Sequence, residues 1–343
     1  MVDVQKLIRP NVRNLKPYSS ARDEFKGFAS VWLDANENPN NNGLNRYPDP
    51  LQWKLKARIS ELKSVSKENI FLGNGSDEAI DLLFRGFCEP GKDKALICSP
   101  TYGMYQVSAD INDVEVIDVP LTQDWQLNTE GIQKHFADPN IKLLFICSPN
   151  NPTGNCMDRK DVLSLASKFN GLVVIDEAYI DFAEQKSFTK ELGNHNNLVV
   201  LQTLSKAWGL AGIRLGMAFA NEEVIEVLNR IKPPYNVNQL TQEVALKELI
   251  DEAGFKKEVE VILTERTRLT NELSQLINVL HIYPSDANFL LVKFRQPKVV
   301  YDALTEKGIV VRDRSKVAEG CLRITVGTPE ENARLLRELE ARS

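Results

Sequence analysis

The sequence is poor in the residues from which metal sites and disulfide frameworks are built. Its 343 residues include only 3 histidines and 5 cysteines. The cysteine count is odd and no two cysteines have C-x-x-C spacing, so neither a disulfide framework nor a zinc site is expected. The histidines lie far apart and away from acidic clusters, which argues against a histidine-rich metal site. We therefore expect ordinary reduced cysteines and no bound metal.

Long apolar runs and an excess of positive charge are also missing. The chain has 42 Lys and Arg residues against 47 Asp and Glu residues, a formal net charge of -5. This balance gives no electrostatic support for binding nucleic acid or an anionic membrane. No stretch approaches the length of a membrane span, and the first residues lack the apolar core of a signal peptide. The sequence predicts a cytoplasmic protein that acts on small molecules, with no nucleic-acid or membrane partner.

What the sequence does contain is an alternation of helical and strand-like segments from about residue 51. Residues 51–63 have the apolar spacing of a helix. Four nearly continuous apolar runs predict strands buried on both faces: they are residues 94–99, 141–148, 171–178 and 198–203. Polar, aromatic and glycine residues follow these runs, at the sheet edge where open α/β sheets bind ligands. The expected fold class is α/β with a mostly parallel central sheet.

A second, smaller unit is predicted after this sheet. After "KPPYNVNQLTQ" (232–242), a long charged helical stretch extends to about residue 278 and could bridge two domains. Beyond it, strands are expected at 288–294, 309–312 and 321–326, and helices near 297–307 and 329–341. We predict an N-terminal arm with part of the small domain at 1–45, a large domain at 46–235, and a small domain with the bridging helix at 236–343.

The segment "FLGNGSDEAIDLLFRGF" suggests a phosphate site or a well-capped helix. Gly73 and Gly75 follow a short apolar run, and Ser76 is a good N-cap for the helix that follows. Free amides at a helix start can hold a phosphate, assisted by the helix dipole. The match to a dinucleotide fingerprint is poor, because Glu78 replaces the third glycine. Taken alone, the two readings are equally supported.

Two further motifs place polar side chains at strand ends. In "VVIDEAYIDF", Asp176 ends four apolar residues, and burying an unpaired charge is costly. The carboxylate therefore belongs to a structural ion pair or faces a cationic ligand atom. In "FICSPNNPTGN", turn chemistry explains Pro152 and Gly154 but leaves Asn151 as a ligand donor of low specificity.

The motif "TLSKAWGLAGIRLG" places Lys206 between an apolar strand and small residues. Most lysines are simply solvated. Here, partial burial and a cationic neighbour, Arg214, would both lower the pKa of the amine, as a nucleophile requires. Pyridoxal phosphate would use all of these motifs at once, because it offers an aldehyde, a ring nitrogen, a phenolate and a phosphate.

In an ordered set of motifs the chain resembles the fold type I, aspartate-aminotransferase-like family of pyridoxal-phosphate enzymes. The set extends over essentially the whole chain: "NLKPYSSAR", "LDANENP", "RYPDP", "GNGSDEAID", "FCEPGKD", "PTYGMY", "SPNNPTGN", "DEAYIDF", "TLSKAWGLAGIRLG" and "CLRITVGT". The resemblance implies a large α/β domain with a mostly parallel sheet, a smaller α+β domain and an N-terminal arm.

The resemblance also implies roles for the polar residues. Lys206 would bind the cofactor aldehyde and later move a proton between substrate and cofactor. Asp176 would keep the ring nitrogen protonated, and Tyr179 and Asn151 would hydrogen-bond the 3-oxygen. The remaining cofactor contacts would be made by Gly75, Ser76, Asp77, Ser205 and Arg214 at the phosphate, by Tyr102 against the ring, and by Tyr47 from the other subunit of a homodimer.

Residues that contact the substrate are implied in the same way. Arg323 would anchor the anionic group of the substrate, and Tyr18 and Tyr47 would complete the site. Arg312 is either a second anchor or an exposed charge at a strand end, and both readings stay open. Glu37 and Asn38 are expected to shape the loop near Tyr47, without an assigned role.

The motifs "NLKPYSSAR", "RYPDP" and "CLRITVGT" most resemble those of enzymes of histidine biosynthesis that act on histidinol phosphate. They imply reversible transfer of an amino group between L-histidinol phosphate and 2-oxoglutarate, giving 3-(imidazol-4-yl)-2-oxopropyl phosphate and L-glutamate. An aromatic aminotransferase or a threonine-phosphate decarboxylase of the same fold stays an alternative. A pyridoxal-phosphate-binding regulator is disfavoured because no segment is left for a DNA-binding module, and a nicotinamide dehydrogenase would leave Lys206 unexplained.

Overall fold

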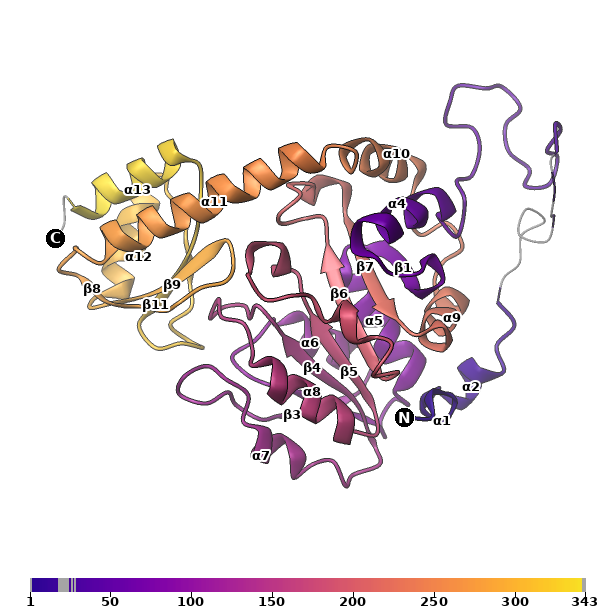
Figure 1. Cartoon of the computed structure of the whole chain (residues 1–343), viewed down its shortest axis with the longest axis horizontal. Helices are drawn as coiled ribbons and strands as arrows, with labels where there is room; N and C mark the ends of the chain where they lie inside the picture. Colours follow the sequence, from indigo (N-terminus) through magenta and orange to yellow (C-terminus); the bar gives the residue numbers. More distant parts are fainter. Residues whose placement is uncertain (1, 18–24, 26, 28, 341–343) are drawn as a thin grey trace.

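The computed structural model describes residues 2–17, 25, 27 and 29–340, which form two sheets with a long helix between them (Figure 1). The larger sheet has seven strands in the order β1-β7-β6-β5-β4-β2-β3. Its strands are β1 Ile70–Asn74, β2 Lys94–Ile97, β3 Glu115–Asp118, β4 Ile141–Cys147, β5 Leu172–Asp176, β6 Leu198–Thr203 and β7 Leu215–Ala220. All pairs from β3 to β6 are parallel, whereas β7 is antiparallel to both of its neighbours. The expected mostly parallel α/β sheet is confirmed.

Helices cover both faces of this sheet because successive strand residues alternate between two apolar cores. In β5, Val173 and Ile175 belong to one core, and Leu172 and Val174 to the other. The first core is closed by α4 Trp53–Lys63, α7 Thr129–Gln133, α8 Arg159–Lys168 and α10 Gln239–Glu248. The second is closed by α1 Val4–Leu7, α2 Pro10–Arg13, α5 Ser76–Phe87, α6 Met104–Ile111 and α9 Glu222–Ile231. Short 3-10 helices lie at Lys67–Asn69, Ile180–Phe182, Phe188–Glu191 and Ala211–Ile213.

The smaller sheet has four antiparallel strands in the order β10-β11-β9-β8. The strands are β8 Val279–Ile282, β9 Phe289–Phe294, β10 Arg312–Asp313 and β11 Cys321–Thr325. Three helices pack on it: α11 Glu252–Leu273, α12 Pro297–Glu306 and α13 Pro329–Glu340. Figure 1 shows α11 extending from this unit towards α10 and the larger sheet.

Two predicted elements of this region were wrong in extent. The strand expected at 309–312 reaches only Arg312, because the amide of Ile309 donates to the carbonyl of Leu304 in α12 rather than to a strand. The helical stretch expected after residue 242 and up to about 278 is divided between two helices, the end of α10 and α11. The break comes where the carboxylate of Asp251 accepts the amide of Gly254 at 2.9 Å and so begins α11.

The described N-terminal residues have two different environments. Val4, Leu7, Ile8 and Val12 are buried in the core that also contains α9. The irregular segment 29–49 extends outside the helix layers in Figure 1. The predicted limits of the three parts of the chain stay a prediction. No helix among the described residues is both long and apolar enough to cross a bilayer.

Candidate active site

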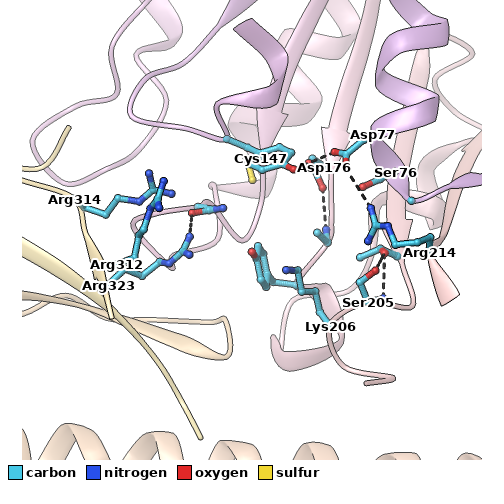
Figure 2. A pocket seen from close by; sticks show the side chains of 16 residues that line it. Ser76, Asp77, Cys147, Asp176, Ser205, Lys206, Arg214, Arg312, Arg314 and Arg323 are labelled. Carbon is cyan, nitrogen blue, oxygen red and sulfur yellow. Dashed lines mark hydrogen bonds and ion pairs between the residues drawn. The ribbon is translucent and has the colours of Figure 1, made fainter. Parts of the chain in front are cut away.

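A cavity of about 380 Å³ opens at the carboxyl ends of β4, β5 and β6, between the two sheets (Figure 2). Twelve of the residues predicted for cofactor or substrate line it: Gly75, Ser76, Asp77, Tyr102, Asn151, Asp176, Tyr179, Ser205, Lys206, Arg214, Arg312 and Arg323. The structure therefore brings together side chains from segments that are far apart in the sequence. The other lining residues are Cys147, Ala178, Thr203 and Arg314.

Lys206 lies in the turn that follows β6, with its Nζ 5.5 Å from the centre of the Tyr179 ring. Two hydrogen bonds set this turn, from the amide of Ser205 to Oγ1 of Thr203 at 3.1 Å and from the amide of Gly209 to the carbonyl of Lys206 at 3.0 Å. Burial lowers the pKa of the Lys206 amine, and the positive charge of Arg323 lowers it further. The predicted cationic neighbour, Arg214, has a smaller effect on this pKa.

Asp176 ends β5 and is only 2% exposed. Its Oδ2 accepts a hydrogen bond from the hydroxyl of Tyr105 at 2.8 Å, and its Oδ1 accepts the amide of Ala178 at 3.1 Å. Burial raises the pKa of this carboxyl to about 6, although both hydrogen bonds act against the rise. No side chain of the described residues forms an ion pair with Asp176, so a cationic ligand atom is the better of the two readings.

The start of α5 approaches the main chain of β7 closely. The amide of Gly75 donates to the carbonyl of Arg214 at 2.9 Å. Gly75 has a φ of 72°, and a Cβ there would lie 2.7 Å from Nη2 of Arg214. A Cβ on Gly216 would lie 2.1 Å from the amide nitrogen of Ser76. Glycine is therefore required at both positions.

The structure corrects the predicted cap of this helix. Gly75 is the N-cap and Ser76 is the first helical residue, with no side-chain cap. The carboxylate of Glu78 instead accepts the amide of Asn74 at 2.5 Å. The first amides of α5 lack partners within the helix and form the positive end of its dipole, which suits an anion.

Asp77 connects two other residues of this end of the cavity. Its Oδ1 accepts the hydroxyl of Tyr102 at 3.0 Å, and its Oδ2 lies 3.6 Å from Nη2 of Arg214. The family resemblance had implied only a contact of Asp77 with the cofactor phosphate. Its carboxylate holds the ring of Tyr102 and the guanidinium of Arg214 in position.

The opposite end of the cavity is formed by arginines of the smaller sheet (Figure 2). Arg312 on β10 lies directly opposite Arg323 on β11. Arg323 donates a hydrogen bond to Oδ1 of Asn151 and lies 5.2 Å from the ring centre of Phe289. Burial lowers the pKa of the Arg323 guanidinium, and nearby Tyr179 partly offsets this decrease. Arg312 thus lies at the cavity as well as at a strand end. This position favours its role as a second substrate anchor over that of an exposed charge.

The predicted tyrosines Tyr18 and Tyr47 differ from the rest. Tyr18 lies outside the described residues. Tyr47 does not line the cavity of its own chain; it is 50% exposed and stacks on Tyr235 with ring centres 4.4 Å apart. The carboxylate of Glu37 accepts the amide of Tyr47 at 2.6 Å and pairs with Arg46 at 2.6 Å. Glu37 therefore shapes this loop, as expected.

Sequence reasoning missed two residues with clear local signals. Tyr105 follows Tyr102 by one helical turn, the spacing that places two side chains near one site. Arg314 follows Arg312 by two residues, the spacing that places two side chains on one face of an extended segment. No signal in the sequence marked Cys147 or Thr203.

Comparison with known proteins identifies the family. The model for "Aminotransferase class I and II" matches residues 20–339. The chain belongs to the class I and II aminotransferase family.

Relatives of this aminotransferase cover its full length. A histidinol-phosphate aminotransferase of Parabacteroides distasonis is 59% identical over 342 residues, which is 99% of both chains. One of Cytophaga hutchinsonii is 54% identical over 340 residues, which is 97% of both chains. The crystal structure of the histidinol-phosphate aminotransferase from Clostridium acetobutylicum has a TM-score of 0.80 at 26% identity, covering 87% of this chain and 91% of that one.

The cofactor of this aminotransferase is pyridoxal phosphate, as its family implies. The residues of the cavity fit this molecule on three independent grounds. Asp176 is a buried carboxylate without an ionic partner among the described side chains, which suits a protonated ring nitrogen. The first amides of α5 suit a phosphate. The amine of Lys206, with its lowered pKa, suits an aldehyde.

Proposed function

We propose that this aminotransferase transfers an amino group reversibly between L-histidinol phosphate and 2-oxoglutarate, giving 3-(imidazol-4-yl)-2-oxopropyl phosphate and L-glutamate, in L-histidine biosynthesis in the cytoplasm. The observation that carries the proposal is the arginine-lined end of the cavity, which faces Lys206. Both L-histidinol phosphate and glutamate carry anionic groups that guanidinium groups bind well. The relatives with more than half of their residues identical agree with this substrate.

We assign the cofactor side of the cavity to the predicted large domain at 46–235. When bound, pyridoxal phosphate supplies an aldehyde that accepts the amino group and a ring that takes up the electrons of the broken C–H bond. The amides of Ser76 and Asp77, with Ser205 and Arg214, hold its phosphate. Tyr102, whose hydroxyl donates a hydrogen bond to Asp77, would pack against the cofactor ring.

Two residues of the cavity hold or move protons. The amine of Lys206 would take up and give back the proton that leaves the substrate α-carbon, and its lowered pKa suits it to act as a base. Asp176 holds the proton at the ring nitrogen. Pairing with that cation relieves the cost of burying its carboxylate.

Tyr179 and Asn151 hydrogen-bond the 3-oxygen of the cofactor. Burial raises the pKa of Tyr179, so its hydroxyl stays protonated and donates. Asn151 already accepts a hydrogen bond from Arg323 through its Oδ1, which leaves its amide nitrogen free to donate to the cofactor. This contact links the cofactor end of the cavity to the substrate end.

Arg323 anchors the anionic group of either substrate, because a guanidinium pairs in a bidentate way with a phosphate or a carboxylate. Arg312 is the second anchor. The two arginines belong to the predicted small domain at 236–343, so substrate binding joins the two domains.

We also propose a homodimer in which Tyr47 serves the cavity of the partner subunit. Support comes from its place outside the cavity of its own chain and from its exposure on a loop fixed by Glu37. Apolar side chains nearby, Leu44 and Leu240, are each 56% exposed and would be covered in a dimer.

Hybrid dimers test this arrangement. Dimers of Lys206→Ala alone and of Tyr47→Ala alone should each be strongly impaired. In a hybrid of the two, one site would combine the native Lys206 of one subunit with the native Tyr47 of the other. We expect activity to rise well above the sum of the parents on subunit exchange. Activity that stays at the parental sum would place Tyr47 in the site of its own chain or rule out the dimer.

The substrate is tested by stopped-flow half-reactions with histidinol phosphate, histidinol, phenylalanine and threonine phosphate. We expect histidinol phosphate to react fastest, and histidinol to lose rate because it lacks the anion. Preference for phenylalanine would indicate an aromatic aminotransferase. Release of carbon dioxide from threonine phosphate would indicate the decarboxylase.

A further inference from the structure

A third arginine, Arg314, lies at the substrate end of the cavity with Arg312 and Arg323 (Figure 2). The amide of Arg314 donates to the carbonyl of Cys321 at 2.9 Å, which continues the pairing of β10 with β11 beyond Asp313. Side chains two residues apart on an extended chain point to the same face. Arg312 and Arg314 therefore present their guanidinium groups from one face of the strand.

The main chain holds Arg314 firmly in place. Its carbonyl accepts the amides of Val317 at 2.9 Å and Ala318 at 2.8 Å, in addition to the bond that its own amide makes. Ala318 is buried, and Arg314 itself is half-buried. The side chain thus starts from a fixed point, which favours a binding role over that of a freely moving surface charge.

The three guanidinium groups lack an acidic partner within the part of the chain that the structure describes. None of the ion pairs among those residues includes Arg312, Arg314 or Arg323. The adjacent carboxylate, Asp313, accepts the amide of Ser315 at 2.8 Å. The Nε of Arg314 is buried and has no hydrogen-bond partner.

Grouping these charges is unfavourable in the absence of a ligand. Burial and the positive charges of Arg323 and Arg312 all lower the pKa of the Arg314 guanidinium. A buried donor without a partner carries a further cost. Such arrangements are found where a ligand of opposite charge binds.

We propose that Arg314 determines substrate specificity by binding, together with Arg312, the phosphate of a phosphomonoester amine. This inference rests on the proposed function and adds a residue to it. Arg323, already tied to Asn151, remains the anchor that phosphate and carboxylate share. A phosphomonoester dianion offers three oxygens and about two charges, whereas a carboxylate offers two oxygens and one charge. Only the phosphate can satisfy three guanidinium forks together.

The experiment uses the holoenzyme, in which the cofactor already fills its own phosphate site. Arg314→Gln and Arg314→Lys are compared with the wild type and with Arg337→Gln, a matched loss of charge on the exposed face of α13. The kcat/KM of each half-reaction is measured, one with histidinol phosphate and one with glutamate. The inhibition constant of inorganic phosphate is measured against the glutamate half-reaction.

We expect Arg314→Gln to lower kcat/KM for histidinol phosphate by about 10- to 100-fold, the loss of one charge-assisted hydrogen-bonded group. The glutamate half-reaction should change by less than about threefold, and phosphate should inhibit at least about tenfold more weakly. Arg314→Lys should lie in between, because an ammonium keeps the charge but loses the fork. Arg337→Gln should match the wild type.

Equal losses with both substrates, or losses below threefold with histidinol phosphate and phosphate alike, would overturn the assignment. If the wild type fails to turn over histidinol phosphate but Arg314→Gln still weakens phosphate inhibition, the proposed substrate is wrong and the assignment of Arg314 stands. Thermal unfolding and cofactor absorbance check each variant for folding. Should Arg314→Gln not fold, Arg314→Lys carries the same comparison.

Discussion

The two ends of the cavity are built in opposite ways. At the cofactor end, both carboxylates accept hydrogen bonds from the protein: Asp77 accepts the hydroxyl of Tyr102 and lies beside Arg214, and Asp176 accepts the hydroxyl of Tyr105. At the substrate end, three arginines face the cavity without an acidic partner among the described residues. The acidic side chains of the cofactor end are already oriented by hydrogen bonds, whereas the charges of the three arginines are balanced only when an anion binds.

This difference follows from what each end must bind. A cofactor that stays bound through the whole reaction benefits from side chains that are already oriented, because no reorganisation is needed at each step. Substrates that alternate in one place require an anchor that accepts more than one anion. Unpaired arginines meet this need at a cost in stability, since like charges repel until an anion binds.

The largest effect is expected at the centre of the cavity. Lys206→Ala should abolish amino-group transfer, while the protein folds and retains cofactor noncovalently, because the contacts at the phosphate and ring remain. Borohydride reduction of the wild type followed by peptide mapping should find the cofactor on Lys206. The exposed Lys160→Ala serves as the control and should keep full activity. Cofactor trapped on another lysine would disprove the assignment.

Asp176→Asn should separate activity from stability at the cofactor end. An amide holds the ring proton less well than a carboxylate, and a lost charge-assisted hydrogen bond of ~1.5–3 kcal/mol lowers the rate by roughly one to two decades. Near-normal turnover would show that Asp176 is only structural. The exposed Asp124→Asn provides a control with the same chemical change.

The same variant should be more stable than the wild type when cofactor is absent. The folded-state pKa of about 6 lies above the ordinary value of 3.8, so ionisation is disfavoured in the folded state. Ionising Asp176 therefore costs folding stability. This cost is absent below pH 3.8, grows as pH rises towards 6 and is then constant at up to ~3 kcal/mol. Urea unfolding at pH 5 and pH 8 should show a larger advantage of the variant at pH 8. An equal difference at both values would contradict the shifted pKa.

The two ends also differ in how well the sequence predicts them. The cofactor end lies on buried strands whose continuous apolar runs end at turns, so Asp176 and Lys206 could be placed at one edge of the sheet before the fold was known. Strand β7 was missed although it follows Lys206 in the same motif, and it determines the approach of Gly216 to Ser76. That contact depends on antiparallel pairing, which a local pattern does not encode.

At the substrate end, prediction reached single residues but not their combination. Arg323 and Arg312 could be singled out. That they lie directly opposite each other depends on the register in which β10 pairs with β11. Arg314 lies beyond the predicted strand end at 312, and its place beside Arg312 depends on pairing with β11 that continues past that point. The hydroxyl contact of Tyr105 with Asp176 joins residues 71 positions apart, and no local signal predicts such a pairing.

Substitutions of the two predicted anchors test how the substrate end binds two different anions. Arg323→Lys should slow both half-reactions by about tenfold, because an ammonium loses the bidentate geometry with either anion. Arg312→Ala should slow the reaction of histidinol phosphate more than that of glutamate. Single-turnover rates for each half-reaction measure this directly. Equal losses with both substrates in Arg312→Ala would remove Arg312 from a selective role.

The smallest effect is expected from Tyr105→Phe, which tests whether the cofactor end is oriented through a second layer of residues. The ring of Tyr105 is fully buried and stacks on Phe145 with centres 4.7 Å apart, so phenylalanine should keep the packing and lose only the hydroxyl. That hydroxyl lowers the pKa of Asp176, and its loss should therefore raise this pKa further.

We expect kcat to fall about threefold to tenfold in Tyr105→Phe, the effect of one hydrogen bond of ~0.5–1.5 kcal/mol, and the acidic limb of the pH–rate profile to move upward. The decisive measurement is a double-mutant cycle, because an amide at position 176 has no carboxyl group left to titrate. If Tyr105 acts by orienting and ionising Asp176, adding Tyr105→Phe to Asp176→Asn should cost little more activity and leave the pH profile unchanged. Losses that simply multiply would show that Tyr105 supports the fold independently of Asp176.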